Sequence, residues 1–502
     1  MTLKEFPLRT VAMSFALGLV TIASASPAGQ NAGAAAGSPD SGKIPVTTAS
    51  DAAKKEFLQG RELAEKLQAQ DSIQHFDKAI SLDAGFALAE LSRANAAPSP
   101  KDFFDHLRKA VALSAKASDG ERLLILATEA GANGDATNQK GYLDQLIAAY
   151  PSDERAHFNI GGYYFGQQDF TSAIEHYRKA TELAASYSPA YNILGYAYRQ
   201  KGDYANAEQA FKKYIALIPK DPNPYDSYAE LLLKMGRFQD SLAQYAKALA
   251  IDSNFLASHL GRAADFMYMG KTGEAASELD MIRKKARSDG DRRTALFGRT
   301  VVAVDSGKWD EALAAMDQQY AIAKQAKDDA AMAGDLQTKG QILLEMAKYD
   351  EAKAAFDQGL KVTEGSSLSD DIKKNARLFE HFNNARIALG RNDLAGARTE
   401  VQAFRSGAET SRNPAFIRQA HELAGIVALQ EKKPEVAIAE LEQASNQNPY
   451  NLYRLCLAYQ AKGDTAKAGQ WCGKAAKFNS LPQLNLAFIR GKAAKLAGGP
   501  TS

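Results

Sequence analysis

The side chains most often used in catalysis and metal binding are few and scattered in this sequence of 502 residues. Its seven histidines show no metal-ligand spacing, and there is no H-E-x-x-H motif. A G-x-S-x-G elbow, a phosphate-binding loop and a dinucleotide fingerprint are also missing. Acidic residues number 59, but no pair stands out as a general acid and base. We therefore expect no enzyme activity, no catalytic residue, no metal site and no cofactor.

Two cysteines, Cys456 and Cys472, could form a disulfide. Cys456 falls at a small-residue position of one expected helix, and Cys472 at an aromatic position of its partner helix. An oxidising compartment would favour a bond between them, worth about 3 kcal/mol for so short a loop. The alternative is two reduced thiols acting as small core side chains. The separation of their Cα atoms decides, because above about 7 Å no bridge can form.

The elements that position these residues repeat with a period of 34. Glycines recur in one column, aromatic residues in a second and small residues in a third. The columns are Gly134, Gly202, Gly236 and Gly270; Tyr177, Phe211 and Tyr245; and Gly161, Gly195, Ala229 and Ala263. A fixed period with fixed chemistry in each column indicates a structural repeat.

One repeat, residues 188–221, shows the expected local structure. Tyr191, Leu194, Gly195 and Tyr198 are spaced as one face of a helix. Gly202 supplies the left-handed turn that ends this helix. A second apolar face follows at Tyr204, Ala207, Phe211 and Tyr214, and Pro219 marks its end. Each unit is therefore predicted to be a helix, a tight turn and a helix, with Gly195 and Ala207 where the two helices touch.

This pattern resembles the tetratricopeptide repeat (TPR) family, through Leu194, Gly195, Tyr198, Ala207, Phe211 and Pro219. Tyr191 and Tyr214 depart from it, since they replace a tryptophan and a small residue. The resemblance implies an all-α fold: a right-handed superhelical solenoid of antiparallel helix pairs, with a concave inner surface. About a dozen helix pairs fit the chain length.

The chain divides into six predicted parts. Residues 1–25 carry Lys4 and Arg9, a short apolar run and small residues before Ala25, which is typical of a cleaved signal peptide. Residues 26–50 are predicted to be a flexible linker. Degenerate repeats follow over 51–152, regular repeats over 153–287, longer or degenerate repeats over 288–481, and a capping helix with a tail over 482–502.

The predicted export and the composition limit which partners we expect. A signal peptide predicts a periplasmic or secreted protein, most simply in a bacterium. The apolar run is shorter than the roughly 20 residues that span a bilayer, so we expect no stable membrane insertion after cleavage. With 61 basic and 59 acidic residues and no basic stripe, nucleic acid is not an expected partner.

The resemblance places a binding groove on one face of each first helix. This groove is expected to hold an extended peptide between polar central repeats and apolar ends. The groove residues are Phe158, Phe165, Asn192, Tyr196, Arg199, Asp226, Glu230 and Met267. The alternative is that Arg199 pairs with Asp226 or Glu230, which would leave a solvated groove.

Two functions remain open. The first is an exported, non-enzymatic scaffold that binds a protein or peptide in the groove, in cell-envelope assembly or secretion. The second is a periplasmic sensor or a module that binds a small molecule or glycan. An open groove would favour the first function, and an aromatic-lined pocket with converging polar groups would favour the second.

Overall fold

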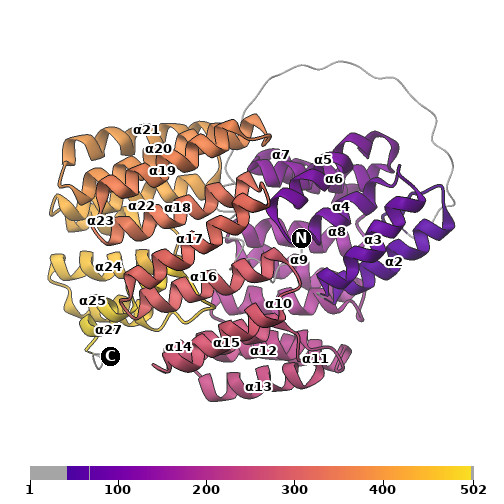
Figure 1. Ribbon diagram of the computed structural model, residues 1–502, viewed down its shortest axis with the longest axis horizontal. Helices are drawn as coiled ribbons and strands as arrows, with labels where there is room; N and C mark the ends of the chain where they lie inside the picture. The colour runs from indigo at the N-terminus through magenta and orange to yellow at the C-terminus, as the bar shows by residue number, and fades with distance from the viewer. Residues whose placement is uncertain (1–41, 67, 499–502) are drawn as a thin grey trace.

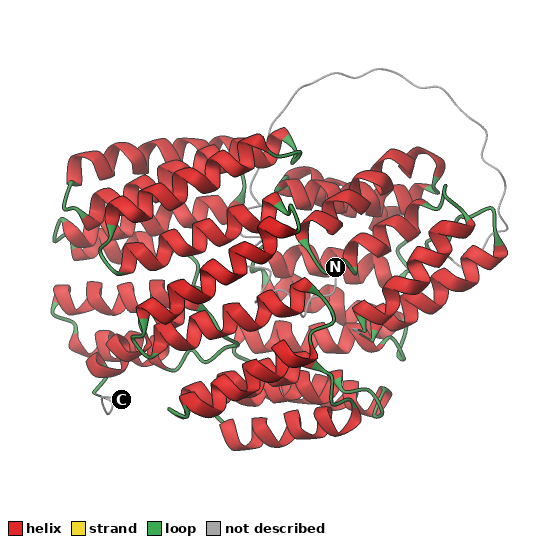
Figure 2. Ribbon diagram, in the orientation of Figure 1, coloured by secondary structure: helices red, strands yellow, loops and turns green. Residues whose placement is uncertain are grey.

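The computed structural model describes residues 42–66 and 68–498, which form helices and connecting turns without a strand (Figure 2). Successive helices pack as antiparallel pairs, so the prediction of an all-α solenoid of helix pairs is confirmed. The predicted signal peptide, residues 1–25, lies outside the described residues.

The first seven helix pairs cover the predicted degenerate and regular repeats. Most of their helices have 12 to 15 residues. The pairs are α2 (Asp51–Glu65) with α3 (Ala69–Leu82), α4 (Ala87–Asn95) with α5 (Pro100–Leu113), α6 (Asp119–Asn133) with α7 (Ala136–Ala149), α8 (Glu154–Gly166) with α9 (Phe170–Leu183), α10 (Ser188–Lys201) with α11 (Tyr204–Leu217), α12 (Asn223–Lys234) with α13 (Phe238–Ile251), and α14 (Leu256–Tyr268) with α15 (Thr272–Lys285); a short 3-10 turn, η2 (Ser114–Lys116), follows α5.

The helices from α16 to α22 are longer, mostly 17 residues. The remaining elements are α16 (Asp289–Asp305) with α17 (Trp309–Gln325), α18 (Asp329–Glu345) with α19 (Tyr349–Gly365), α20 (Asp370–Gly390) with α21 (Leu394–Ser411), α22 (Pro414–Gln430) with α23 (Pro434–Leu441), α24 (Pro449–Lys462) with α25 (Thr465–Ala476), and two short helices, α26 (Leu484–Ala487) and α27 (Arg490–Leu496). The capping helix predicted within 482–502 is thus two pieces, because the backbone departs from helical geometry at Ile489 (φ −121°), where the Ile489 side chain is buried in the core.

The turn and the contact between the two helices of a pair form where the sequence predicts them. Gly202 ends α10 with φ +85°, a left-handed conformation that glycine adopts without a Cβ clash. A Cβ placed on Gly195 would lie 2.7 Å from the Phe211 ring, so the glycine lets α10 and α11 approach. The same close approach of a first-helix glycine to an aromatic ring recurs between Gly161 and Tyr177.

Part of the predicted linker is docked on the repeats. The backbone N–H of Ile44 donates to Asp153 Oδ2 at 2.8 Å, and that of Thr47 donates to Glu121 Oε1 at 2.8 Å. Asp153 and Glu121 also belong to the N-terminal caps of α8 and α6. Each carboxylate therefore accepts hydrogen bonds both from the N-terminal end of a helix and from this extended segment. Residues 42–50 are therefore not a free tether.

The superhelix brings its two halves together along a seam. In Figure 1 the helices α2 to α9 lie on one side and α17 to α25 on the other, with α11 to α15 below. Turns of the early repeats contact helix starts of the late ones: Asn413 Nδ2 donates to Gly134 O at 3.0 Å, and Ser445 Oγ donates to Gln168 Oε1 at 2.9 Å. These partners are 279 and 277 residues apart in sequence.

The C-terminal segment, residues 477–489, packs against the inner side of α12, α14 and α16. Tyr268 Oη donates to Ser480 O at 2.6 Å, and Lys234 Nζ donates to Phe478 O. Leu484 and Phe488 share a buried core cluster with side chains of α14 and α16. The chain end therefore fills part of the concave side that the sequence predicts to be open.

Candidate functional site

A cavity of about 420 Å³, which we call the central cavity, lies where the two halves of the superhelix face each other. Its walls come from the first helices α8, α10 and α12, from the start of α9, from α18, α20, α22 and α24, and from the C-terminal segment. Aromatic residues on these elements line it: Phe165, Phe170, Tyr196, Phe379, Phe382, Tyr450 and Phe478. This volume falls within the range of small-molecule sites.

Four of the predicted groove residues line the central cavity. They are Phe165 on α8, Tyr196 and Arg199 on α10, and Glu230 on α12. Arg199 Nη1 donates to Glu230 Oε2 at 3.2 Å, and its guanidinium lies 4.5 Å from the Tyr196 ring centroid. The pairing of Arg199 with Glu230 is the alternative raised above, yet these side chains face a cavity and not a solvated groove.

Two further predicted groove residues line a second cavity. Phe158 and Asn192 surround a space of about 150 Å³ together with Tyr187 and residues of α2 to α4. Beside this cavity, Arg155 Nη2 forms an ion pair with Glu65 Oε1 at 2.9 Å, and the Arg155 guanidinium lies 5.2 Å from the Tyr187 ring centroid. The second cavity therefore extends the concave side toward the N-terminal repeats.

The last two predicted groove residues are not on an accessible surface. Met267 is buried in the core cluster that includes Leu484 and Leu486 of the C-terminal segment. Asp226 is also buried, and its Oδ1 accepts a hydrogen bond from Ser258 Oγ at 2.7 Å. The apolar end of the expected groove is thus occupied by the chain itself.

Positive charge is concentrated in the central cavity. Arg454 pairs with the buried Glu422 at 2.6 Å, as Arg199 pairs with Glu230. Lys234 and Arg386 also line the cavity, but neither forms an ion pair within the part of the chain that the structure describes. Glu345 and Glu422, the carboxylates whose charge acts on Arg386, are engaged by Lys492 at 3.6 Å and by Arg454.

These surroundings shift the proton affinities of the cavity residues. Burial lowers the pKa of Lys234 to about 7, and the charge of Arg199 adds to the effect. Burial and the charge of Arg454 lower the pKa of Arg386 as well. Burial alone would raise the pKa of Glu422, but Arg454 and Arg386 hold it below its usual value. The cavity therefore favours negative charge over further positive charge.

Sequence reasoning missed the half of the cavity that comes from α18 to α24 and the C-terminal segment. Phe379, Phe382 and Arg386 on α20 lie on one helix face over a span of seven residues, as Asn192, Tyr196 and Arg199 do on α10. Extending that spacing into the longer repeats would have found them. No signal in the sequence points to Phe478, because it lies in an irregular segment after the last helix pair.

The histidines have structural partners in the helix pairs. His259 Nδ1 lies 2.6 Å from Glu278 Oε2, and His157 Nδ1 lies 3.2 Å from His176 Nδ1. Several such pairs join residues 19 apart, a spacing that links the first and second helices of one repeat. In the described part of the chain, no group of three or more metal-ligating side chains comes together.

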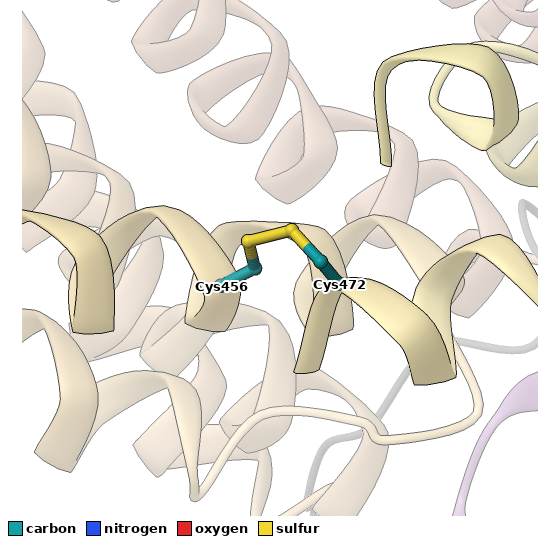
Figure 3. The surroundings of a disulfide bond; sticks show 2 residues. All are labelled: Cys456 and Cys472. Atoms are coloured by element: carbon teal, nitrogen blue, oxygen red, sulfur yellow. A yellow bond between two sulfur atoms is a disulfide. The ribbon is translucent and has the colours of Figure 1, made fainter. Parts of the chain in front are cut away.

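Cys456 and Cys472 form a disulfide between α24 and α25, with a Cα–Cα distance of 5.1 Å (Figure 3). Their separation of 16 residues equals that of Gly195 from Phe211 and of Gly161 from Tyr177. The bond therefore takes the place of the glycine–aromatic contact that closes other helix pairs. Of the two possibilities for these cysteines, the structure shows the bonded one.

A fold of stacked helix pairs is that of a helical-repeat protein. Family models described as tetratricopeptide repeat match residues 126–189, 188–221 and 336–365. The chain therefore contains tetratricopeptide repeats in these segments. Proteins of this family are in general scaffolds that bind other proteins. Over the described residues, no helix has the length and apolar character needed to cross a membrane.

Similar proteins share the repeats over part of their length. DnaJ homolog subfamily C member 7 of Homo sapiens is 28% identical over 101 residues, covering 19% of this chain and 20% of the relative. Cell division cycle protein 16 homolog of Mus musculus is 22% identical over 222 residues, covering 42% of this chain and 34% of the relative. The chain thus spans about a third or less of these relatives.

Two solved structures are also similar. The crystal structure of MamA protein has 20% sequence identity and a TM-score of 0.28, covering 33% of this chain and 91% of that one. A tetratricopeptide repeat protein from Parabacteroides merdae ATCC 43184 has 14% identity and a TM-score of 0.27, covering 62% of this chain and 99% of that one.

Proposed function

We propose that this chain is an exported, non-enzymatic TPR scaffold that holds a compact ligand in its central cavity. The supporting observation is that Tyr196, Arg199 and Glu230 from the regular repeats converge with Phe379, Arg386 and Arg454 from the late repeats on one aromatic-lined space. An extended peptide would need a continuous surface across four repeats. The burial of Met267 under the C-terminal segment favours a compact ligand instead.

Export is supported by the disulfide and by the sequence of residues 1–25. Disulfides persist in oxidising compartments and are rare in the bacterial cytoplasm. The bond between Cys456 and Cys472 therefore supports a periplasmic or secreted location, as does the signal-peptide pattern ending near Ala25.

A binding role, not a catalytic one, fits the carboxylates of the cavity. Glu230 and Glu422 are each paired with an arginine, and the pKa of Glu422 is lowered by Arg454 and Arg386 despite its burial. A general acid must hold a proton near neutral pH, which such a carboxylate does not. Scaffolding is also the general role of the family.

The second candidate function is a scaffold for a protein partner in cell-envelope assembly or secretion, the setting in which export would place it. Membership of the TPR family favours it. A short end of a partner chain could enter the central cavity, whereas a long peptide could not follow the covered groove. The same experiment separates the two candidates.

The test fills the cavity with a side chain. Gly166 lines the central cavity, and a Cβ built on it meets no atom within 4 Å. The mature chain and its Gly166→Phe variant are incubated with envelope extract and examined by native mass spectrometry. We expect a small-molecule adduct on the parent protein and its loss in the variant, because phenylalanine occupies the ligand's space.

A matched control is Gly141→Phe on α7, where a Cβ also meets no atom within 4 Å but no cavity is present. This control should keep the adduct. Capture of a protein, lost in Gly166→Phe and kept in Gly141→Phe, would support the second candidate. Identical adducts on all three proteins would refute a ligand in the central cavity.

A further inference from the structure

The central cavity holds more positive charge than its own carboxylates balance. Four cationic side chains line it, Arg199, Lys234, Arg386 and Arg454, against two carboxylates, Glu230 and Glu422. Both carboxylates already pair with arginines. The side chains of Lys234 and Arg386 are left without a carboxylate partner, and keeping such charges away from water is costly. An anionic group on a ligand would offset this cost.

Lys234 and Arg386 come from opposite halves of the superhelix. Lys234 ends α12 and Arg386 lies on α20. The Nζ of Lys234 has a backbone carbonyl as its partner, Phe478 O, and lies 3.5 Å from the Phe478 ring centroid. Arg386 lies 5.9 Å from the Phe382 ring centroid. Each cation is thus oriented by an aromatic ring, and neither is neutralised.

Amide side chains form the other polar part of the lining. Gln200, Gln341, Gln419, Gln447 and Asn485 reach the cavity from five different elements or connections. The side chains of Gln200, Gln341 and Asn485 form no hydrogen bond to another described residue, and Gln419 Oε1 is buried without a partner. An amide both donates and accepts, so it suits hydroxyl groups, which do the same.

Aromatic rings complete the lining and limit the ligand's shape. Phe165, Tyr196, Phe379 and Phe478 are among the aromatic side chains of the wall. Flat apolar faces with a few polar groups between them suit a ring that carries C–H groups on its faces and hydroxyls at its edge. The volume of about 420 Å³ admits one or two such rings.

We propose that the central cavity binds an anionic saccharide, a sugar ring carrying a carboxylate or phosphate that Lys234 and Arg386 neutralise. This inference rests on the proposed function, because it names the class of ligand for the same cavity. The lowered pKa of Lys234 agrees with it, since an anion would restore the protonated amine.

The test is isothermal titration calorimetry of the mature chain with four probes: D-glucuronate, D-glucose 6-phosphate, D-glucose and acetate. We expect at least one of the two anionic sugars to bind about ten-fold or more tightly than either glucose or acetate. The comparison of glucuronate with glucose 6-phosphate identifies the anionic group. Added salt should weaken this binding, because the attraction is between charges.

Variants locate the anion. Arg386→Gln and Lys234→Gln each remove one unpaired charge and should lower the affinity for the anionic sugar about ten-fold, with little effect on any binding of glucose. Arg418→Gln is the matched control, because Arg418 is a half-buried arginine on α22 that donates to Gln167 O and does not line the cavity. Circular dichroism shows whether each variant keeps its helices.

Equal binding of glucose and the anionic sugars would overturn the inference, and so would acetate binding as tightly as the sugars. Failure of all four probes would overturn it too. If the adduct from envelope extract is nevertheless lost in Gly166→Phe, the cavity remains a ligand site and only its assignment to an anionic saccharide falls. If that adduct also persists, the proposed function falls with it.

Discussion

At the scale of single residues, the interior holds an ionisable group without an ion-pair partner among the described residues. Asp265 on α14 is fully buried, and Ser241 and Arg262 offset only part of the cost of burying its carboxylate. Burial raises the pKa of Asp265 to about 8, so this side chain is a neutral acid at pH 7.

The pH dependence of stability follows from this shift. In the unfolded chain Asp265 ionises near pH 4, whereas in the folded chain it keeps its proton until about pH 8. The unfolded state therefore binds fewer protons between these values, and the contribution of Asp265 to stability is lost as pH rises from about 4 to about 8.

We expect Asp265→Asn to match the parent protein in Tm near pH 4 and to exceed it by a few degrees at pH 8.5, because asparagine stays neutral throughout. Scanning calorimetry at several pH values measures this. A constant Tm difference across the range would show that Asp265 does not titrate as described.

The sequence identified some residue-scale contacts and could not identify others. The position of Gly195 at the contact between two paired helices was expected, although it is the Phe211 ring that a Cβ there would meet. The pairing of Arg199 with Glu230 was one of the alternatives, because it joins adjacent repeats. The contact of Lys234 with Phe478 joins residues 244 apart. No local pattern carries that information.

At the scale of the helix pair, two kinds of contact join the first helix to the second. Most often a small residue on the first helix receives a large side chain from the second, as Gly340 receives Phe356. In α24 and α25 the disulfide between Cys456 and Cys472 takes these positions. Both cysteines lie at the column positions that the sequence predicts, and the distance between them decides that they are bonded.

Removing the disulfide should destabilise the end of the solenoid. Closing a loop of this length contributes about 3 kcal/mol. We expect the parent protein to lose several degrees in Tm on reduction with dithiothreitol. The variant Cys456→Ala, Cys472→Ala should start from the lower Tm and not respond to the reductant.

Either an unchanged Tm in the reduced parent protein, or a further fall in the double variant, would contradict this role. Hydrogen exchange can show where the loss occurs. Because solenoid repeats contact mainly their neighbours, faster exchange should appear in α24 to α27 and the adjoining residues.

At the scale of the whole molecule, the two halves meet along a seam that the 34-residue period does not predict. The seam joins residues more than 270 positions apart, and the helices α16 to α22 on one side of it are longer than those of the regular repeats. The fold class could therefore be predicted from local columns of residues. The central cavity could be predicted only on the side built from the regular repeats.

Gly290 offers a test of the seam. It lies in the first turn of α16, and a Cβ there would be 2.3 Å from the backbone carbonyl oxygen of Pro98. A backbone atom cannot rotate away, so Gly290→Ala should separate the early repeats from α16. We expect a larger radius of gyration in small-angle X-ray scattering, with the helix content unchanged in circular dichroism.

The matched control is Gly273→Ala on α15, because a Cβ on Gly273 meets no atom within 4 Å and its φ is not positive. Gly307→Ala would not serve as a control, because Gly307 has a positive φ. Gly273→Ala should leave the radius of gyration unchanged. If Gly290→Ala also leaves it unchanged, the seam is not held by the contact of α16 with Pro98.

The position of the C-terminal segment has a consequence for how the protein is made. Residues 477–489 supply one wall of the central cavity, and they follow in the chain all the helix pairs that build its other walls. Each of those helix pairs can fold while the cavity still lacks that wall. The central cavity therefore reaches its complete form only when this segment docks against α12, α14 and α16.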